Sequence, residues 1–424
     1  MRSRRAPLTG LLSAVGISTL GTRMTFLAIP WFVLTTTGSA TTTGVIAFAE
    51  MGPYVAVQAL GGPIVDRLGA KRTSVVTDLV AALAMGAIPI LHGLGDLSIP
   101  LLAVLVCVGG SARGAGDAAR YVLVPGVTEI AETSLERSSG LYDGVGRLAS
   151  LIGLPAAGGL VVLISATNVL ALDAATFALS ALLVAIMVPL RAQPPKTSES
   201  PGEVEASYLA SLRAGLRFLR ADRLLLGIAV MVLVTNFVDQ AGGAVLFPVW
   251  ADRIMHSAAD LGLLGGAFAL GAVAGNGLTT WLAPHLPRRL TYGVGFLLAG
   301  APRYLAVAFI SGLAPILVIA FVSGLGAGGI NPILGAIEYE RVPRHLQARV
   351  LGTVGALAWA GIPFGSLVGG AAVSAIGLRT SLLIAAAVYA VTTLSPFVFP
   401  AWRGMRRDAG LSPEYRGATK VAGT

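Results

Sequence analysis

The chain is organised as long apolar runs separated by short polar segments. Most runs reach the roughly 20 residues that a helix needs to cross the hydrocarbon core of a bilayer. The pattern predicts twelve spanning helices, at residues 8–34, 41–61, 73–92, 98–119, 139–163, 168–190, 224–248, 259–283, 290–310, 315–337, 350–374 and 379–400. The first run follows three arginines as a signal peptide would, but it is too long for one and contains Arg23 and Pro30. We therefore predict an all-α membrane protein.

The longest polar stretch, residues 191–223, falls between the sixth and seventh runs. It divides the chain into an N-terminal half (1–190) and a C-terminal half (224–400), which a tail (401–424) follows. Its second part is amphipathic: Leu, Tyr and Arg side chains separate onto two helical faces, with Tyr208, Leu209, Leu212, Leu216 and Leu219 on one and Arg213, Arg217 and Arg220 on the other. This pattern predicts a linker helix that lies on the membrane surface.

The two halves resemble each other. Pro30 and Pro248 are 218 residues apart, and Val124-Pro125 recurs at the same offset as Val342-Pro343. A Gly-x-Pro sequence in the fifth run, at Gly153, recurs in the eleventh at Gly361. Two pseudo-symmetric sets of six helices are typical of transporters that work by alternating access.

The composition excludes several classes of protein. The chain is 55% hydrophobic and only 12% charged, with a mean hydropathy of +0.79, so it cannot cover a large water-facing surface. The single cysteine, Cys107, excludes a disulfide framework and a thiolate metal site. No glycine loop for nucleotides is present, which argues against ATP-driven transport, and no catalytic cluster suggests an enzyme. We expect no cofactor, no metal and no nucleic-acid partner.

The basic residues predict the orientation. Of the 30 Lys and Arg residues, 24 lie in segments on one side of the predicted spans, two (Arg253 and Arg379) on the other and four within spans. Positively charged loops stay in the cytoplasm. We therefore predict that both termini and the 191–223 segment are cytoplasmic.

The loop after the second span reads Gly-Pro-Ile-Val-Asp-Arg-Leu-Gly-Ala-Lys-Arg over residues 62–72. This loop resembles the signature loop of the major facilitator superfamily, whose fold has twelve helices in two six-helix halves. The resemblance implies a gating role for Gly62, Asp66, Arg67, Gly69, Lys71 and Arg72. It further implies that Asp66 latches the halves near Arg349, at the start of the eleventh span.

The fifth span carries a sequence similar to the antiporter motif of drug-exporting branches of the same superfamily, at Gly153, Pro155, Gly158 and Gly159. Leu154 stands where that motif has glycine. A stripe of small residues also serves simple helix packing, so both interpretations stay open. Further short stretches, at 37–40, 117–120 and 347–350, resemble the macrolide and tetracycline efflux branch.

Charged side chains within spans are candidates for function because their burial is unfavourable. Glu50 and Arg23 both fall near mid-membrane on successive helices, which suggests a Glu50–Arg23 pair. Arg113, Asp117 and Arg120 share one face of the fourth span, and Asp143 and Arg147 one face of the fifth. The candidates for proton coupling are Glu50, Asp239, Asp117 and Asp143. The alternative is a paired charge near the outer end of the span for Asp239, and a purely structural network for Asp143.

The family architecture implies that the first, fourth, seventh and tenth spans line a central cavity. The candidates for substrate binding there are Arg23, Arg113, Asn236, Gln240, Asn331, Phe26, Trp31, Tyr54 and Phe237. Asp78, Asp173 and Arg303 are expected to be structural or interfacial. The cavity helices are mostly apolar with isolated charges, which favours an amphipathic substrate over a sugar.

These observations predict a secondary transporter of the bacterial cytoplasmic membrane that exchanges protons for amphipathic drugs or related small molecules. Import of a small metabolite by the same fold is the alternative, and a non-transporting receptor is another. We expect a monomer whose partners are the substrate, protons and the lipid bilayer.

The charge distribution makes the topology testable. Reporter fusions at Gln193 and after Arg403 should both report a cytoplasmic location, because both sites lie among the 24 basic residues of one side. A periplasmic signal from either fusion would contradict the predicted orientation.

Overall fold

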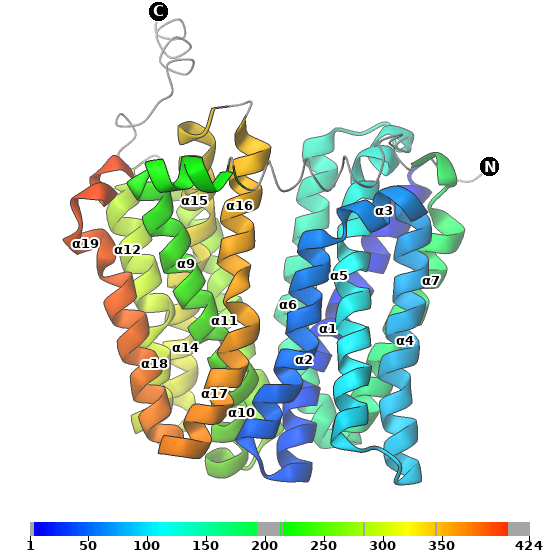
Figure 1. Cartoon of the computed structure of the whole chain (residues 1–424), viewed down its shortest axis with the longest axis horizontal. Coiled ribbons are helices and arrows are strands. Elements are labelled where there is room, and N and C mark those ends of the chain that lie inside the picture. Colours follow the sequence, from blue (N-terminus) through cyan, green and yellow to red (C-terminus); the bar gives the residue numbers. More distant parts are fainter. Residues whose placement is uncertain (1–3, 193–212, 214, 283–284, 344–345, 406–424) are drawn as a thin grey trace, which may run out of the picture. The chain divides into compact units, whose positions relative to one another are not determined.

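The structure is a computed structural model that describes residues 4–192, 213, 215–282, 285–343 and 346–405. The N-terminal spans are α1 (Ala6–Thr37), α2 (Ala40–Leu60), α4 (Ala70–Leu94), α5 (Ile99–Ile130), α6 (Leu135–Ile164) and α7 (Ala166–Met187), with the short α3 (Gly62–Leu68) in the loop after α2. The described chain is helical throughout these runs (Figure 1), as the apolar pattern predicts.

Most C-terminal spans are built from shorter helical pieces that follow one another. The seventh span consists of α9 (Arg223–Ala241), α10 (Phe247–Trp250) and two π-helical turns, Gly242–Leu246 and Ala251–Met255. The eighth is the single helix α11 (Ala258–Leu282). The last four are α12 with α13 (Arg288–Ala299, Ala301–Phe309), α14 with α15 (Leu313–Gly328, Ile330–Arg341), α16 with α17 (Gln347–Ala360, Ile362–Ile376), and α18 with α19 (Leu378–Thr393, Ser395–Val398). Pro248 lacks an amide donor and crowds the preceding turn, which accounts for a widened turn just before it.

Eleven of the described helices are long and apolar enough to cross a membrane. The remaining predicted span is α2, whose 21 residues are long enough but include Glu50 and several threonines. It packs along α1 and α5 as a spanning helix would. The helix order therefore agrees with the predicted architecture.

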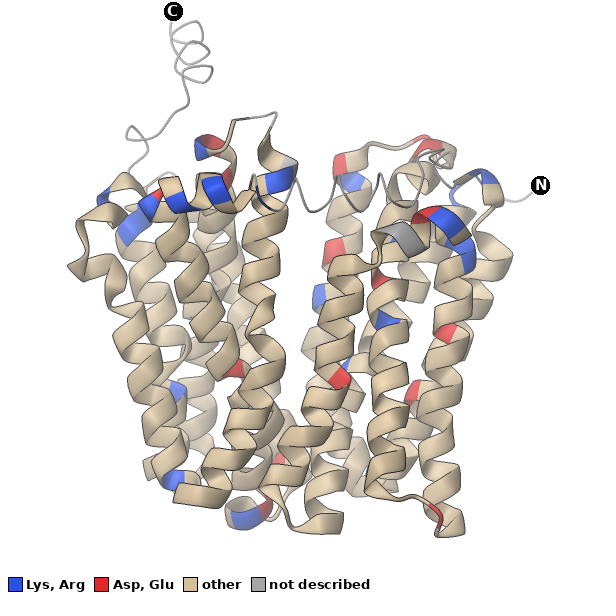
Figure 2. Cartoon of the chain, in the orientation of Figure 1, with Lys and Arg blue, Asp and Glu red and all other residues tan. Residues whose placement is uncertain are grey.

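Two packing units are present, and only the first contains segments from both sequence halves. The first comprises residues 1–199, 240–266 and 366–378; the second comprises 200–239, 267–365 and 379–424. The predicted division at 191–223 stays a prediction, because the first unit also includes 240–266 and 366–378 from the C-terminal half. In each unit, Lys and Arg gather at one end of the helices (Figure 2).

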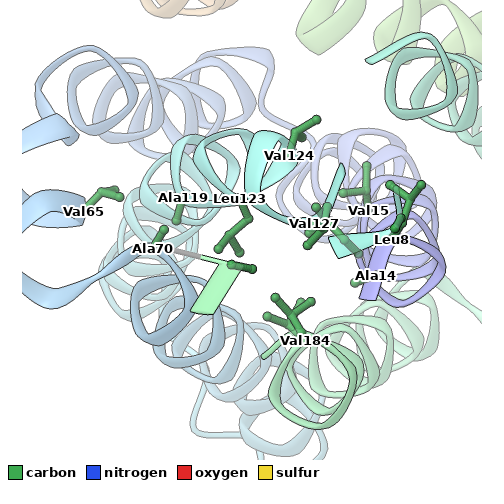
Figure 3. Packing of buried hydrophobic residues seen from close by; sticks show 14 residues of the cluster. Leu8, Ala14, Val15, Val65, Ala70, Ala119, Leu123, Val124, Val127 and Val184 are labelled. Atoms are coloured by element: carbon green, nitrogen blue, oxygen red, sulfur yellow. The ribbon is translucent and has the colours of Figure 1, made fainter. Parts of the chain in front are cut away.

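An apolar cluster at that end of the first unit joins α1, α4, α5 and α7 (Figure 3). Leu11, Leu123 and Val184 are fully buried within it. Alanines at the crossings allow the helices to approach closely, as in other membrane bundles where lipid is as apolar as the side chains.

The described part of the predicted linker helix is amphipathic. Residues 215–221 are helical; Leu219 is buried, whereas Arg217 and Arg220 are exposed. Gly215 lies against Thr353 of α16, so the helix packs on the second unit with its apolar side. Tyr208, Leu209 and Leu212 lie outside the described residues.

Glycines set two close helix crossings within the first unit. A Cβ atom added at Gly158 of α6 would lie 2.7 Å from the carbonyl oxygen of Ala258 and 2.9 Å from Cα of Gly262 in α11. Similarly, a Cβ added at Gly44 of α2 would lie 3.2 Å from Cα of Gly370 in α17. The backbones touch at these points because no side chain separates them.

These crossings predict that valine substitutions at two neighbouring glycines of α6 differ strongly in their effect on stability. Gly158→Val should lower the thermal stability of the detergent-solubilised protein, by about 1–3 kcal/mol, because the added carbons meet backbone atoms of α11. Gly159→Val is the matched control, since an added Cβ there meets nothing within 4 Å. Equal melting temperatures for the two variants would contradict the crossing.

Candidate functional site

The centre of the first unit is an ion pair between α2 and α5. Arg113 Nη1 donates a 2.6 Å hydrogen bond to Glu50 Oε1, and both side chains are only 4% exposed. Two glycines allow this contact. They are Gly110, one turn before Arg113, and Gly114, the residue after it. These glycines lie against the α2 backbone at Glu50 and Tyr54, respectively. The small residues bring the helices close enough for a short side chain to reach the guanidinium.

Aromatic rings surround the same guanidinium. The Arg113 Cζ atom lies 5.2 Å from the ring centre of Phe26 on α1 and 5.2 Å from that of Tyr54 on α2. Contacts of this kind stabilise a cation in an environment with little water. The predicted cavity residues Arg113, Phe26 and Tyr54 are thus brought together.

The predicted Glu50–Arg23 pair is wrong. Arg23 instead donates from Nε to Ser150 Oγ of α6 at 3.0 Å, and its Cζ lies 5.5 Å from the ring centre of Phe26. Arg23 and Arg113 therefore flank one ring, and it is Arg113 that pairs with the Glu50 carboxylate. Adjacency along the sequence suggested the wrong partner because α2 presents Glu50 to α5 rather than to α1.

A second network continues along α5. Arg120 binds both oxygens of Asp78 from α4, at 2.6 and 2.8 Å, and also Asp117 at 2.7 Å. Ser180 of α7 donates to Asp78 at 2.7 Å. Arg120 and Asp78 are buried, so this network joins three helices and fits the structural role expected for Asp78.

Asp117 links the two clusters. Its side chain is 41% exposed, and it accepts a 3.1 Å hydrogen bond from Tyr54 Oη besides its bond to Arg120. Arg113, Asp117 and Arg120, which the sequence places on one face, thus belong to one connected set of contacts. Asp117 is therefore the exposed carboxylate in a set of charged residues that is otherwise buried.

Asp143 and Arg147 of α6 are both exposed, and neither joins an ion pair with another described residue. Their predicted roles stay predictions.

The second unit has its own charged cluster. Arg303 of α13 donates to Asp239 of α9 at 2.9 Å, and the hydroxyl of Tyr389 on α18 lies 3.5 Å from the other carboxylate oxygen. The Arg303 guanidinium lies 4.4 Å from the ring centre of Phe268. Asp239 is 39% exposed, far more than Glu50. Sequence reasoning assigned Arg303 a structural role and did not find this partnership.

The remaining cavity candidates are spread more widely. Asn236 donates to the carbonyl oxygen of Ala358 at 2.8 Å, which ties α9 to α16. Phe237 lies against Gly361. Asn331 on α15 is exposed, and Trp31 and Gln240 are half-buried. Their roles in substrate binding stay predictions.

The signature loop forms α3 and the start of α4. Gly69 adopts φ 84°, a conformation that glycine accommodates without strain, and it separates the two helices. Lys71 donates to the carbonyl oxygen of Ala185 on α7 at 2.8 Å. Asp66 and Arg67 are exposed beside Gly62. Asp66 and Arg349 belong to different units, and the latch between them stays a prediction.

The antiporter-like motif residues take part in packing. Gly153 lies against the Arg23 side chain of α1, Gly158 against Gly262, and Pro155 against Gly266 of α11. These contacts show that the stripe serves helix packing. They leave a role in antiport untested.

Sequence reasoning missed the hydrogen bonds of one buried carboxyl group. Asp173 of α7 is fully buried and accepts hydrogen bonds from Thr25 of α1 and Thr176. The signal was present, since a lone carboxyl in an apolar run needs donors on a neighbouring helix. Within the described residues, no group of three His, Cys, Asp or Glu side chains is placed to hold a metal ion.

A family model supplies the identity of this fold. The model described as Major Facilitator Superfamily matches residues 11–255 and 231–420, nearly the whole chain. The chain belongs to the major facilitator superfamily. It is therefore a transporter of small molecules and not an enzyme.

Curated relatives of this chain include exporters. The multidrug efflux pump Tap of Mycobacterium tuberculosis is 31% identical over 411 residues, which cover 95% of each chain. Tap of Mycolicibacterium fortuitum is 30% identical, covering 90% of this chain and 92% of the relative. The enterobactin exporter EntS of Escherichia coli is 26% identical, covering 87% and 84%.

Solved structures confirm the fold. The nucleoside transporter NupG superposes with a TM-score of 0.72 at 14% identity, covering 94% of this chain and all of that one. A bacterial homologue of the lysosomal transporter Spinster gives 0.71 at 14% identity, covering 97% and 100%. The twelve-helix superfamily fold expected from the signature loop is confirmed.

The Glu50–Arg113 pair predicts strong thermodynamic coupling. Arg113→Gln leaves a buried carboxylate without its cation and should destabilise the protein by about 3–5 kcal/mol. Adding Glu50→Gln should recover part of that loss, because neither charge then remains unpaired. Thermal unfolding of both single variants and the double variant measures the coupling. Arg147→Gln, at an exposed site, is the control, and additive losses at 50 and 113 would contradict the pairing.

Proposed function

We propose that this superfamily member exports amphipathic small molecules, drugs among them, in exchange for protons. The observation that carries the proposal is the buried Glu50–Arg113 pair with a partly exposed carboxylate, Asp117, one helical turn away. A carboxylate in this setting holds a cation only while it is ionised. Binding a proton therefore changes the interaction between α2 and α5.

The proton step follows from the contacts. With Glu50 ionised, its carboxylate neutralises Arg113 and joins α2 to α5. When a proton binds a Glu50 oxygen, the attraction between Glu50 and Arg113 is lost, while the Arg113 guanidinium still contacts the rings of Phe26 and Tyr54. Asp117 is the nearest carboxylate along α5 that can attract the freed guanidinium. Alternation between these two arrangements couples proton occupancy to helix packing.

The substrate class rests on two supports. The relatives at 30–31% identity are multidrug efflux pumps, and the more distant EntS is an exporter as well. The aromatic rings of Phe26 and Tyr54 next to charged groups suit molecules with an apolar body and a polar or charged part. We assign Asp239 with Arg303 as the second proton or cation site, in the other unit.

We place the protein in a bacterial cytoplasmic membrane with both termini in the cytoplasm, from the side preference of its basic residues. In this orientation the signature loop with Asp66 and Arg67 lies at the cytoplasmic side and gates access from there. An importer of small metabolites by the same fold is the competing function.

A susceptibility screen tests the proposal. Cells that lack their own efflux pumps and express this chain should tolerate higher concentrations of several amphipathic drugs, and a protonophore should abolish the difference. Substrate accumulation in energised, expressing cells would instead indicate import. Resistance that survives the protonophore would contradict proton coupling.

Coupling is expected to depend on Glu50. In proteoliposomes with an imposed pH gradient, Glu50→Gln should abolish uphill transport while downhill exchange of substrate survives, since exchange needs no net proton step. Asp96→Asn, in an exposed loop, is the control. If Glu50→Gln still concentrates substrate, Asp239→Asn is the next variant, and uphill transport by both would exclude these two carboxylates as the coupling site.

A further inference from the structure

A cavity at the basic end of the second unit takes no part in the proposed transport. It has a volume of about 990 Å³ and lies between the start of α9, the ends of α18 and α19, and the segment Pro400–Met405. Phe218, from the linker helix, closes one side. All of its walls belong to the second unit.

The cavity is apolar along most of its length. Trp402, which is 3% exposed, lies against Gly227 of α9 and forms part of the wall. The lining also includes Val230 of α9, 49% exposed, and Val391 of α18, 72% exposed. In a membrane protein, exposed valines on two neighbouring spanning helices face acyl chains. The cavity therefore opens toward lipid between α9 and α18.

One end of the cavity is cationic. Arg341 and Arg223 both line it, but they differ in their partners. Arg341 is neutralised by Asp222, whose Oδ2 accepts from Nε at 2.9 Å. The other oxygen of Asp222 accepts from the backbone amides of Leu224 and Leu225, which start α9. Asp222 is thus fully engaged.

Arg223 remains as the surplus charge. It is exposed and joins no ion pair among the residues that the structure describes. Arg213, Arg217 and Arg220 are exposed on the adjoining linker helix, so this surface carries four arginines and a single acid within eleven residues. The charge of this surface complements an anion.

The distance between the charged and apolar parts matches a lipid molecule. Along α9, Arg223 and Met231 are separated by eight residues, or roughly 12 Å of helix. One leaflet of the hydrocarbon core is about 15 Å thick. A headgroup phosphate at Arg223 therefore has its acyl chain beside Val230 and Met231.

We propose that this cavity binds one anionic phospholipid, with the phosphate on Arg223 and an acyl chain along Gly227, Val230 and Val391. The bound lipid fills the gap between the linker helix and the seventh and twelfth spans. It belongs to the inner leaflet if the proposed orientation is correct, but binding itself does not depend on that orientation or on drug export.

Native mass spectrometry of the purified full chain tests the site. The protein is exchanged into detergent with phosphatidylglycerol or with phosphatidylcholine of the same acyl chains. We expect one phosphatidylglycerol to be retained at least tenfold more strongly, because a guanidinium–phosphate bond is charge-assisted and the choline headgroup adds a cation. Equal retention of the two lipids would overturn the proposal.

Matched variants distinguish lipid binding in the cavity from general attraction of anionic lipid to a basic surface. Arg223→Gln should weaken phosphatidylglycerol retention about tenfold, whereas Arg217→Gln, on the adjoining linker helix and outside the cavity, should leave it within twofold. Equal losses would show diffuse attraction and overturn the site. Gly227→Leu, which fills the apolar part, is the second variant and should reduce retention of the lipid even if Arg223→Gln folds poorly.

The tail is the competing occupant. A chain that ends at Met405 should retain phosphatidylglycerol as the full chain does. A severalfold gain in lipid retention after truncation would show that residues beyond Met405 occupy the cavity, which would overturn the assignment to lipid. None of these measurements uses transport activity, so they remain informative if the proposed export function fails.

Discussion

The close approach of α2 to α5 is the constraint on which the charged centre of the first unit depends. Glu50 and Arg113 are both removed from water, and separate burial of either charge is strongly unfavourable. The pair exists because Gly110 and Gly114 let the α2 backbone lie against α5. From this contact follow the positions of Tyr54 and Phe26 around the guanidinium and the link through Tyr54 to Asp117. A change in helix spacing therefore changes the electrostatics of the whole cluster.

The two units differ in how far their charged pairs are buried. In the first, the Glu50–Arg113 pair is closed and almost inaccessible, and the Asp78–Arg120 pair is buried deeper still. In the second, Asp239 is paired with Arg303 but remains substantially exposed. The pseudo-repeat thus preserves the order of helices without preserving the charges. The two units of a single chain therefore present chemically different charged groups.

Much of this organisation is readable from the sequence. Apolar runs predict the spans, and the loop at residues 62–72 predicts the superfamily. Spacing along α5 predicts that Arg113, Asp117 and Arg120 act together. Partner choice is harder: Glu50 binds Arg113 and Asp239 binds Arg303, each across more than sixty residues. Helix rotation sets these pairs, and an apolar run says little about rotation because lipid and protein surfaces are similarly apolar.

The glycine crossings have a consequence for side-chain entropy. Where Gly158 meets Gly262 and Gly44 meets Gly370, the touching surfaces have no rotatable side chains at the point of contact. Forming such a contact orders no rotamers, and separating it releases none. The attraction at these points comes from close backbone packing, without interlocking side chains. Helices joined in this way can separate without any side chain changing its rotamer at the contact, which interdigitated leucines would not permit.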